Sequence, residues 1–236
     1  MTDHTTKAFD VDLRELTRMV EEMGVRVLKQ IADSLDALAN HDSDLGQRAI
    51  AVDPEIDSLQ HAIEEKAVLT IARRQPMAID LREIIGAVRI SNDLERVGDL
   101  AKNIGKRILP LAADVHPENL MLGAERMGEL VLGRMRDVLD SYARRDLDVA
   151  LTVWNGDEEV DSLCTSLFRE LLTYMMEDSR NITYCIHLMF CAKNIERIGD
   201  HATNVADTVY YLVEGRTIPQ KTRPKGDDTV LAALSR

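Results

Sequence analysis

Residues 91–104 read SNDLERVGDLAKNI, and residues 192–205 read AKNIERIGDHATNV. The two stretches share six identical residues at an offset of 101, and three further positions exchange Leu, Ile or Val. Chance gives roughly one identity in a window of this size, judged from average residue usage. The sequence therefore predicts an internal repeat.

A second pair of matching stretches extends the repeat towards the N-terminus. Residues 53–59 read DPEIDSL and residues 157–163 read DEEVDSL, at an offset of 104. The three-residue difference between the two offsets falls between the matching stretches, where a loop tolerates a change of length. We therefore expect two copies of one unit.

Apolar residues step by three and four along nearly the whole chain, which is typical of amphipathic helices. Pro54 should kink its helix or mark a short break, and Asn155-Gly156 should be the weak point of the equivalent helix. Six long helices with short connections predict an all-α fold of two pseudo-symmetric three-helix bundles. The predicted helices cover about 13–38, 44–74, 78–109, 118–144, 146–176 and 181–213.

The domain organisation follows from the repeat. We expect a first three-helix repeat at 1–112 and a second at 113–214, joined by a connector at 109–117 that is bounded by prolines. Residues 215–236 change in composition towards proline and cations, and a flexible tail is expected there.

The composition restricts the partners and the compartment. Acidic residues outnumber basic ones by 41 to 29, so the net charge of −12 opposes nucleic acid and anionic lipid as partners. The three cysteines contain no C-x-x-C pair, which favours a reducing compartment. No apolar run approaches the ~18 residues that a membrane span needs. A cytoplasmic protein without a membrane span is expected.

Each predicted half carries two motifs in which two acids lie four residues apart. Residues four apart lie one turn apart on the same helix face, so each motif presents a pair of carboxylates. One motif per half lies on the second helix and one on the third, and antiparallel neighbours can bring them together. The candidate metal ligands are Asp53, Asp57, Glu95, Asp99, Asp157, Asp161, Glu196 and Asp200, with Asn103 and Asn204 as weaker candidates.

Four carboxylates on one patch repel each other, and a divalent cation removes that repulsion. Oxygen-only ligands suit magnesium, calcium, manganese or iron, and several carboxylates can bridge more than one ion. The alternative is a solvated acidic face, in which Arg96 and Arg197 form i,i+3 ion pairs with Asp99 and Asp200. Repetition in register favours the metal site. His61 and His201 are adjacent to the motifs but are not repeated in the other half.

The sequence favours a protein that is not an enzyme. It contains no nucleophile motif, P-loop or G-x-G-x-x-G. The Glu-x-x-His signature of ferritin-like di-iron proteins is also missing, which argues against an oxidase. Two alternatives stay open: a metal-dependent phosphohydrolase that uses clustered ions to activate water, and a metal-free helical scaffold.

The motifs LERVGDLAKN and IERIGDHATN, preceded by QPMAIDLREI at 75–84, resemble the PhoU family of phosphate-signalling regulators. The resemblance covers about residues 10–214. It implies twin three-helix bundles in a cytoplasmic, dimeric, negative regulator of phosphate uptake. It also implies action with a phosphate ABC transporter and a sensor histidine kinase.

The resemblance further implies a metal role for the eight acids of the four motifs named above. The expected cofactors are iron, zinc, manganese or magnesium ions, held in clusters of more than one ion. Pro54 lies between Asp53 and Asp57, so the first motif is expected on a distorted turn.

Overall fold

The computed structural model describes residues 2–110 and 120–219, and within these ranges the regular structure is helical throughout. The first half consists of α1 (Thr2–Asn40), α2 (Ser43–Ala51), α3 (Asp53–Arg74) and α4 (Ile79–Ile108). The second half consists of α5 (Leu122–Arg144), α6 (Leu147–Asn155), α7 (Asp157–Glu177), the short 3-10 helix η2 (Ser179–Asn181) and α8 (Ile182–Glu214). The predicted all-α fold of two three-helix bundles is confirmed.

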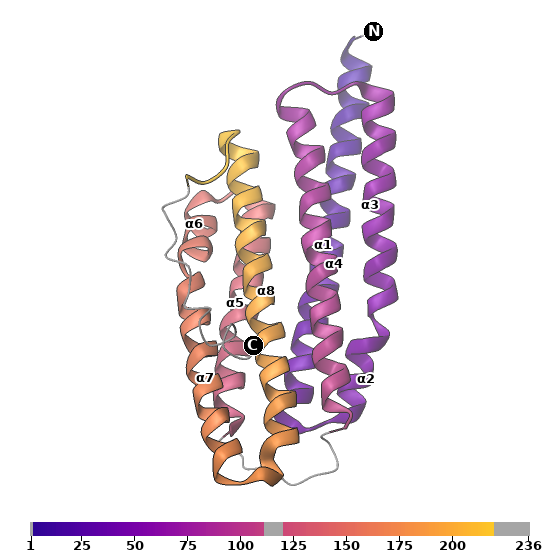
Figure 1. The fold of residues 1–236 in the computed structure, drawn as a ribbon. Helices are drawn as coiled ribbons and strands as arrows, with labels where there is room; N and C mark the ends of the chain where they lie inside the picture. The colour runs from indigo at the N-terminus through magenta and orange to yellow at the C-terminus, as the bar shows by residue number, and fades with distance from the viewer. Residues whose placement is uncertain (1, 111–119, 220–236) are drawn as a thin grey trace, which may run out of the picture.

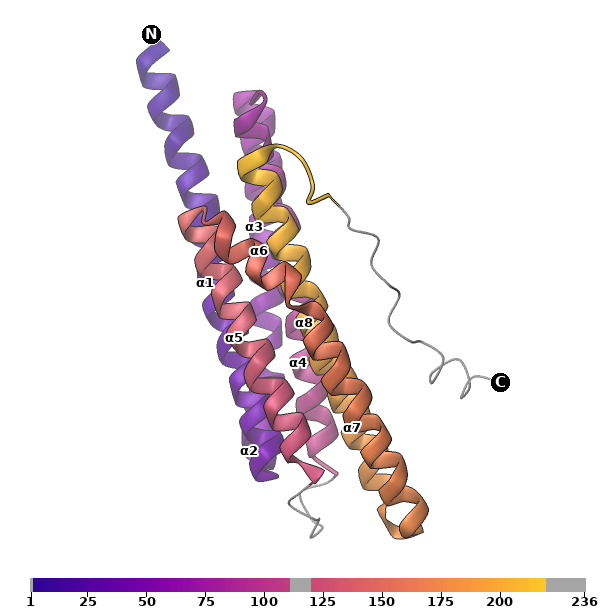
Figure 2. The same ribbon diagram turned by 90° about the vertical axis from the view of Figure 1, so that its left-hand side faces the viewer.

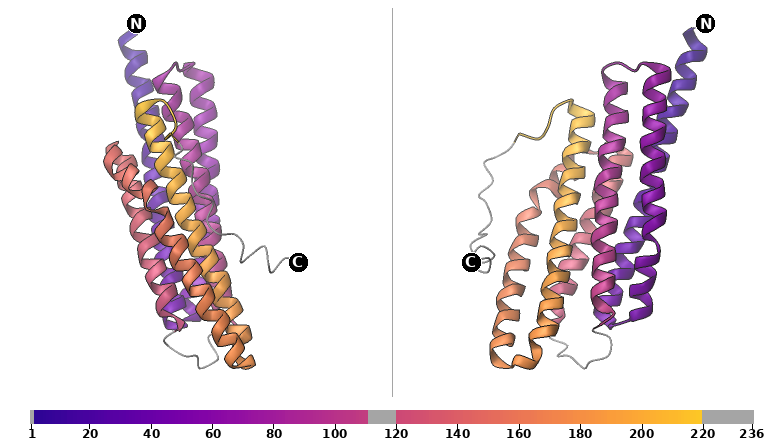
Figure 3. Two further views of the ribbon diagram at one scale, coloured as in Figure 1. Left: turned by 60° about the vertical axis from the view of Figure 1, so that its left-hand side comes forward. Right: turned by 45° about the vertical axis from the view of Figure 1, so that its right-hand side comes forward.

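The two bundles lie side by side with their long axes roughly parallel (Figure 1). In each, one of the three helices is broken near its start, as α2 and α3 in the first bundle and α6 and α7 in the second (Figures 2 and 3). The central pair is α4 and α8, which pack along each other between the halves, and α1 packs on α5 beside them. One continuous apolar core therefore runs through both repeats.

Both predicted helix interruptions are present. The chain turns from α2 into α3 at Val52, and Pro54 is the second residue of α3, where its missing N–H removes no intrahelical bond. The second half breaks at Gly156 without a proline. A Cβ at Gly156 would lie 2.8 Å from the Nη2 atom of Arg134, so a side chain at this break would displace the arginine.

Helices α1 and α5 meet at two equivalent contacts, in each of which a glycine of one helix faces a leucine of the other. A Cβ on Gly24 would lie 3.0 Å from Leu139, and a Cβ on Gly128 would lie 2.6 Å from Leu35. Gly24 and Gly128 are equivalent in the repeat, and so are Leu35 and Leu139. Each repeat thus inserts a leucine over the glycine of the other, which fixes the two long helices at close range.

Some predictions lie beyond the described ranges. They are residues 111–117 of the connector, residues 118–119 at the start of the predicted fourth helix, and residues 220–236 of the tail. The domain boundaries at 112 and 214 stay predictions. No helix in the part that the structure describes is both long and apolar enough to cross a membrane.

Candidate metal centres in the two repeats

The break in the second helix of each repeat positions the first acid of each acidic site. Asp53 is the first residue of α3 and Asp157 is the first residue of α7. The N–H groups of a helix's first turn are unbonded, and the helix dipole stabilises negative charge there. Both aspartates are buried, at 8% and 7% exposure. Sequence reasoning found the breaks, but it did not connect them with the burial of these carboxylates.

In the second repeat, the structure brings Asp157, Asp161 and Asp200 together. One carboxylate oxygen from each lies within 4.8 Å of the others. Among the described residues, no other group of three or more Asp, Glu, His and Cys side chains is comparably close. Burial, and next the negative charges of Glu196 and Asp161, raise the pKa of Asp200 to about 6. Such a group of hard oxygen ligands fits a divalent cation.

Glu196, the remaining acid of this half, is bound by a lysine. The Nζ atom of Lys193 lies 2.7 Å from Oε1 and 2.6 Å from Oε2 of Glu196. Lys193 is equivalent to Asn92 of the first repeat, which instead accepts a hydrogen bond from Gln60 at 2.8 Å. Glu196 therefore has a cation of its own, although its charge still acts on Asp200.

The first repeat also gathers its four acids. Burial raises the pKa of Glu95, and the negative charges of Asp99, Asp57 and Asp53 act in the same direction, although Arg96 opposes them. All four motif residues therefore lie close enough to interact.

A lysine lies at the centre of this first site. The Nζ atom of Lys102 is 2.7 Å from Oδ2 of Asp53 and also donates to Oδ1 of Asp99. Burial of the ammonium acts to lower its pKa, but the hydrogen bonds to the two aspartates outweigh burial and raise it. Lys102 is therefore a firmly charged cation between carboxylates of two helices. The residues of the first site do not fit a metal ion in this arrangement.

The repeat gives the second site a different residue at this position. Thr203 is equivalent to Lys102, and its Oγ1 atom lies 3.1 Å from Oδ1 of Asp157. A neutral hydroxyl thus contacts the first aspartate where the other repeat has an ammonium. The aligned stretches already contained this difference, but only the structure shows that the position faces the acids.

The weaker candidates lie apart from the acidic groups. His201 Nδ1 is 2.8 Å from Oδ1 of Asp93, and Asn204 donates to the same oxygen at 3.3 Å. His61 is exposed on α3, 4.0 Å from Glu64. Asn103 lines a separate pocket between α4 and α8.

Sequence reasoning did not single out a thiol beside the second site. Burial, and next the charges of Glu196 and Asp161, raise the pKa of Cys164 to about 12. Cys164 is equivalent to Gln60, so the repeat offered no signal of shared chemistry at this position.

Two matched three-helix repeats, each with acids converging from its second and third helices, define a double-bundle protein with one acidic site per repeat. A family model described as the PhoU domain matches residues 20–108 and 124–209. The chain belongs to the PhoU family.

Known proteins of this family are similar to the chain over nearly its full length. A Rhizobium meliloti (strain 1021) protein named "Phosphate-specific transport system accessory protein PhoU homolog" is 54% identical over 226 residues, covering 96% of this chain and 95% of the relative. The crystal structure of PhoU from Pseudomonas aeruginosa superimposes with a TM-score of 0.86 at 38% identity, covering 88% of this chain and 100% of that one. The phosphate transport system regulatory protein PhoU from Streptococcus pneumoniae gives a TM-score of 0.82 at 28% identity, covering 90% and 100%.

Proposed function

We propose that this chain is a negative regulator of phosphate uptake and phosphate signalling that depends on a metal ion. It acts as a helical adaptor between a phosphate ABC transporter and a sensor histidine kinase, in the cytoplasm and as a homodimer. The family supports a role in phosphate transport, since relatives carry the names "accessory protein" and "regulatory protein" of such systems. The resemblance of the motifs supports the adaptor role and the partners.

The group formed by Asp157, Asp161 and Asp200 is the observation that carries the metal proposal. Three carboxylates within 4.8 Å repel each other, and burial, together with the negative charges of Glu196 and Asp161, raises the pKa of Asp200. A bound cation would offset the repulsion and return Asp200 to its charged form. Iron, manganese, magnesium or zinc accepts such carboxylate ligands.

The acidic site of the first repeat already contains a positive charge. Asp53, Asp57, Glu95 and Asp99 have the sequence pattern of ligands, but the ammonium of Lys102 already supplies a positive charge between two of them. We therefore propose that the second repeat binds the metal and that Lys102 takes the place of an ion in the first. A metal in the first site would have to displace Lys102.

Metal content and phosphate uptake test the proposal together. The protein is purified without a His-tag, and its metal is measured by mass spectrometry beside the Asp157→Asn/Asp161→Asn/Asp200→Asn variant. The matched control is the Asp53→Asn/Asp57→Asn/Asp99→Asn variant, which changes the same number of acids in the other repeat. Each variant is also expressed in cells that lack the native protein, and phosphate uptake is recorded.

We expect metal in the wild type and in the control, but not in the second-repeat variant, together with derepressed uptake in the latter. Absence of metal from the wild type, even after incubation with iron, manganese or zinc, would remove the metal centre from the proposal. Full repression by a variant without metal would show that regulation does not need the ion.

A further inference from the structure

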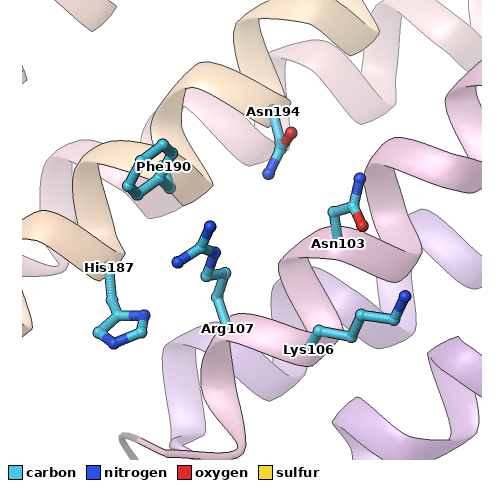
Figure 4. Close-up of a pocket in the computed structure, with 6 residues that line it drawn as sticks. All are labelled: Asn103, Lys106, Arg107, His187, Phe190 and Asn194. Carbon is cyan, nitrogen blue, oxygen red and sulfur yellow. The ribbon is translucent and has the colours of Figure 1, made fainter.

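A basic pocket of about 450 Å³ lies between the end of α4 and the first half of α8. Figure 4 shows the guanidinium of Arg107 between His187 on one side and the amides of Asn103 and Asn194 on the other. None of the described residues that line the pocket is acidic, although the chain as a whole carries a net charge of −12. The lining residues are Asn103, Lys106, Arg107, His187, Phe190 and Asn194.

The polar groups of this pocket are available to a ligand. The guanidinium carbon of Arg107 lies 4.2 Å from the ring centroid of Phe190, and this stacking orients the group without using its N–H donors. Within the described ranges, Lys106 and Arg107 form no ion pair, and Asn103 and Asn194 form no side-chain hydrogen bond. Four donor-bearing side chains therefore converge on one space, and none of them has a polar side-chain partner among the described residues.

The other repeat shows that this arrangement is not a consequence of the fold. At an offset of 101 residues, Lys106 and Arg107 correspond to Asp207 and Thr208. Asn194 corresponds in the same way to Asp93, which is bound by His201 and Asn204. Asp207 is also in use, since it accepts a hydrogen bond from the backbone N–H of Ile218 at 2.8 Å. Of these two equivalent positions, the end of α4 is therefore the one that carries the cations.

We propose that this pocket binds a phosphate group, carried by inorganic phosphate or by a phosphate monoester. A guanidinium, an ammonium and two amides together match the several oxygens of a doubly charged tetrahedral anion. Charge-assisted hydrogen bonds from arginine to phosphate are short and strong, and they also fix the orientation of the ligand. The proposal does not depend on the metal centre, which uses other residues.

His187 adds a feature that favours phosphate over sulfate. Its Nδ1 atom is buried and has no hydrogen-bond partner within the described structure. Burial, and next the positive charge of Arg107, lower the pKa of His187, so the ring is neutral near neutral pH. A neutral imidazole offers one acceptor nitrogen. Inorganic hydrogen phosphate has a proton to donate to it, whereas sulfate and a doubly ionised monoester have none.

Phe190 also lines a neighbouring apolar groove of about 300 Å³, together with Phe168, Ile186, Met189 and Lys193. Phe190 is 49% exposed, so its ring is accessible from this side. An organic group attached to the phosphate can lie in this groove. A monoester with a planar ring therefore gains apolar contact that inorganic phosphate lacks.

Calorimetric titration of the full chain tests the proposal, after treatment with a chelator that removes metal from the acidic sites. The probes are inorganic phosphate, adenosine monophosphate and sulfate. The variants are Arg107→Gln and Lys106→Gln, with Arg89→Gln as the control. Arg89 lies on the same helix and also stacks on an aromatic ring, with 4.8 Å from its guanidinium carbon to the Tyr211 centroid.

We expect the wild type to bind phosphate or adenosine monophosphate, and Arg107→Gln and Lys106→Gln each to weaken that binding about tenfold. Tighter binding of the nucleotide identifies the monoester as the ligand, and binding of phosphate alone identifies the free ion. Arg89→Gln should retain wild-type affinity. Failure of the wild type to bind either phosphate probe would overturn the proposal. Equal binding of sulfate, or equal losses in Arg89→Gln and Arg107→Gln, would also do so.

Discussion

Lys102 on α4 and Thr203 on α8 occupy the same position of the two repeats, and each contacts the first aspartate of its acidic site. The ammonium lies 2.7 Å from Asp53, and the hydroxyl lies 3.1 Å from Asp157. The position beside the first aspartate is therefore charged in the first site and neutral in the second, whose lysine, Lys193, instead lies beside Glu196. This difference makes the charge at position 102 or 203 a direct test of which repeat binds metal.

Replacing Lys102 by Thr should give the first site the neutral hydroxyl that the second site has at this position. Without the ammonium, Asp53 and Asp99 repel each other, and a divalent cation becomes the only counter-charge available to both. We expect the number of bound metal ions per chain to rise, measured by mass spectrometry and by calorimetric titration. Without metal, the variant should lose about 1 kcal/mol of stability with the ion pairs. An unchanged metal content would show that Lys102 does not exclude the ion.

The reverse change, Thr203→Lys, should place an ammonium beside Asp157 and remove metal from the second site. The physical reason is competition, because both cations would need the same carboxylate oxygens. Thr203→Ser is the matched control, since it keeps the hydroxyl that contacts Asp157. Circular dichroism before the metal measurement separates loss of the ion from loss of the fold. Retention of metal by a folded Thr203→Lys variant would contradict the assignment of Asp157 as a ligand.

Much of the fold could be predicted because it depends on local patterns. The repeat appeared as identical residues at a fixed offset, and Pro54 and Gly156 marked the helix breaks in advance. The three-to-four spacing of apolar residues gave the helices to within a few residues at most ends. Local signals of this kind act through the neighbouring turn, so they are visible in a short window of sequence.

The sites were only partly predictable, because their chemistry depends on contacts between helices. The acid pairs were visible from their i,i+4 spacing, but the spacing could not show that Lys102 reaches Asp53 on another helix. His201 looked like a neighbour of Asp200, whereas its ring contacts Asp93 of the other repeat at 2.8 Å. The basic pocket combines Arg107 with His187, and no sequence window contains both.

The glycine contacts between α1 and α5 predict a clear difference between two alanine variants of one helix. Gly128→Ala places a Cβ 2.6 Å from Leu35 Cδ2, and the interface has to open to accept it. We expect a loss of about 1–3 kcal/mol in the free energy of unfolding, as for other overpacked sites. Urea denaturation followed by circular dichroism measures it.

Gly133→Ala on the same helix is the control, because nothing lies within 4 Å of its Cβ position. Alanine has the higher helix propensity, so this variant should be stabilised by up to about 1 kcal/mol. Equal effects of the two substitutions would mean that helix propensity, and not the leucine contact, decides the outcome.

His187 predicts how stability changes with pH. Burial, and next the charge of Arg107, lower the pKa of the folded-state imidazole below its ordinary value of 6.5. The unfolded chain therefore binds the proton more readily than the folded protein. It follows that this residue's contribution to stability is fully present above pH 6.5 and is lost as the pH falls through 6.5 towards the folded-state pKa.

Replacing His187 by Gln should remove this part of the pH dependence, because no proton is then taken up at this position on unfolding. In urea titrations over this range, the slope of the unfolding free energy against pH should become shallower by at most about 1.4 kcal/mol per pH unit. His61→Gln is the control, since that side chain is 79% exposed, and it should retain the wild-type slope. If His187→Gln also kept the full slope, the proton taken up on unfolding would belong to another group. The neutral imidazole assigned to the basic pocket would then lose its support.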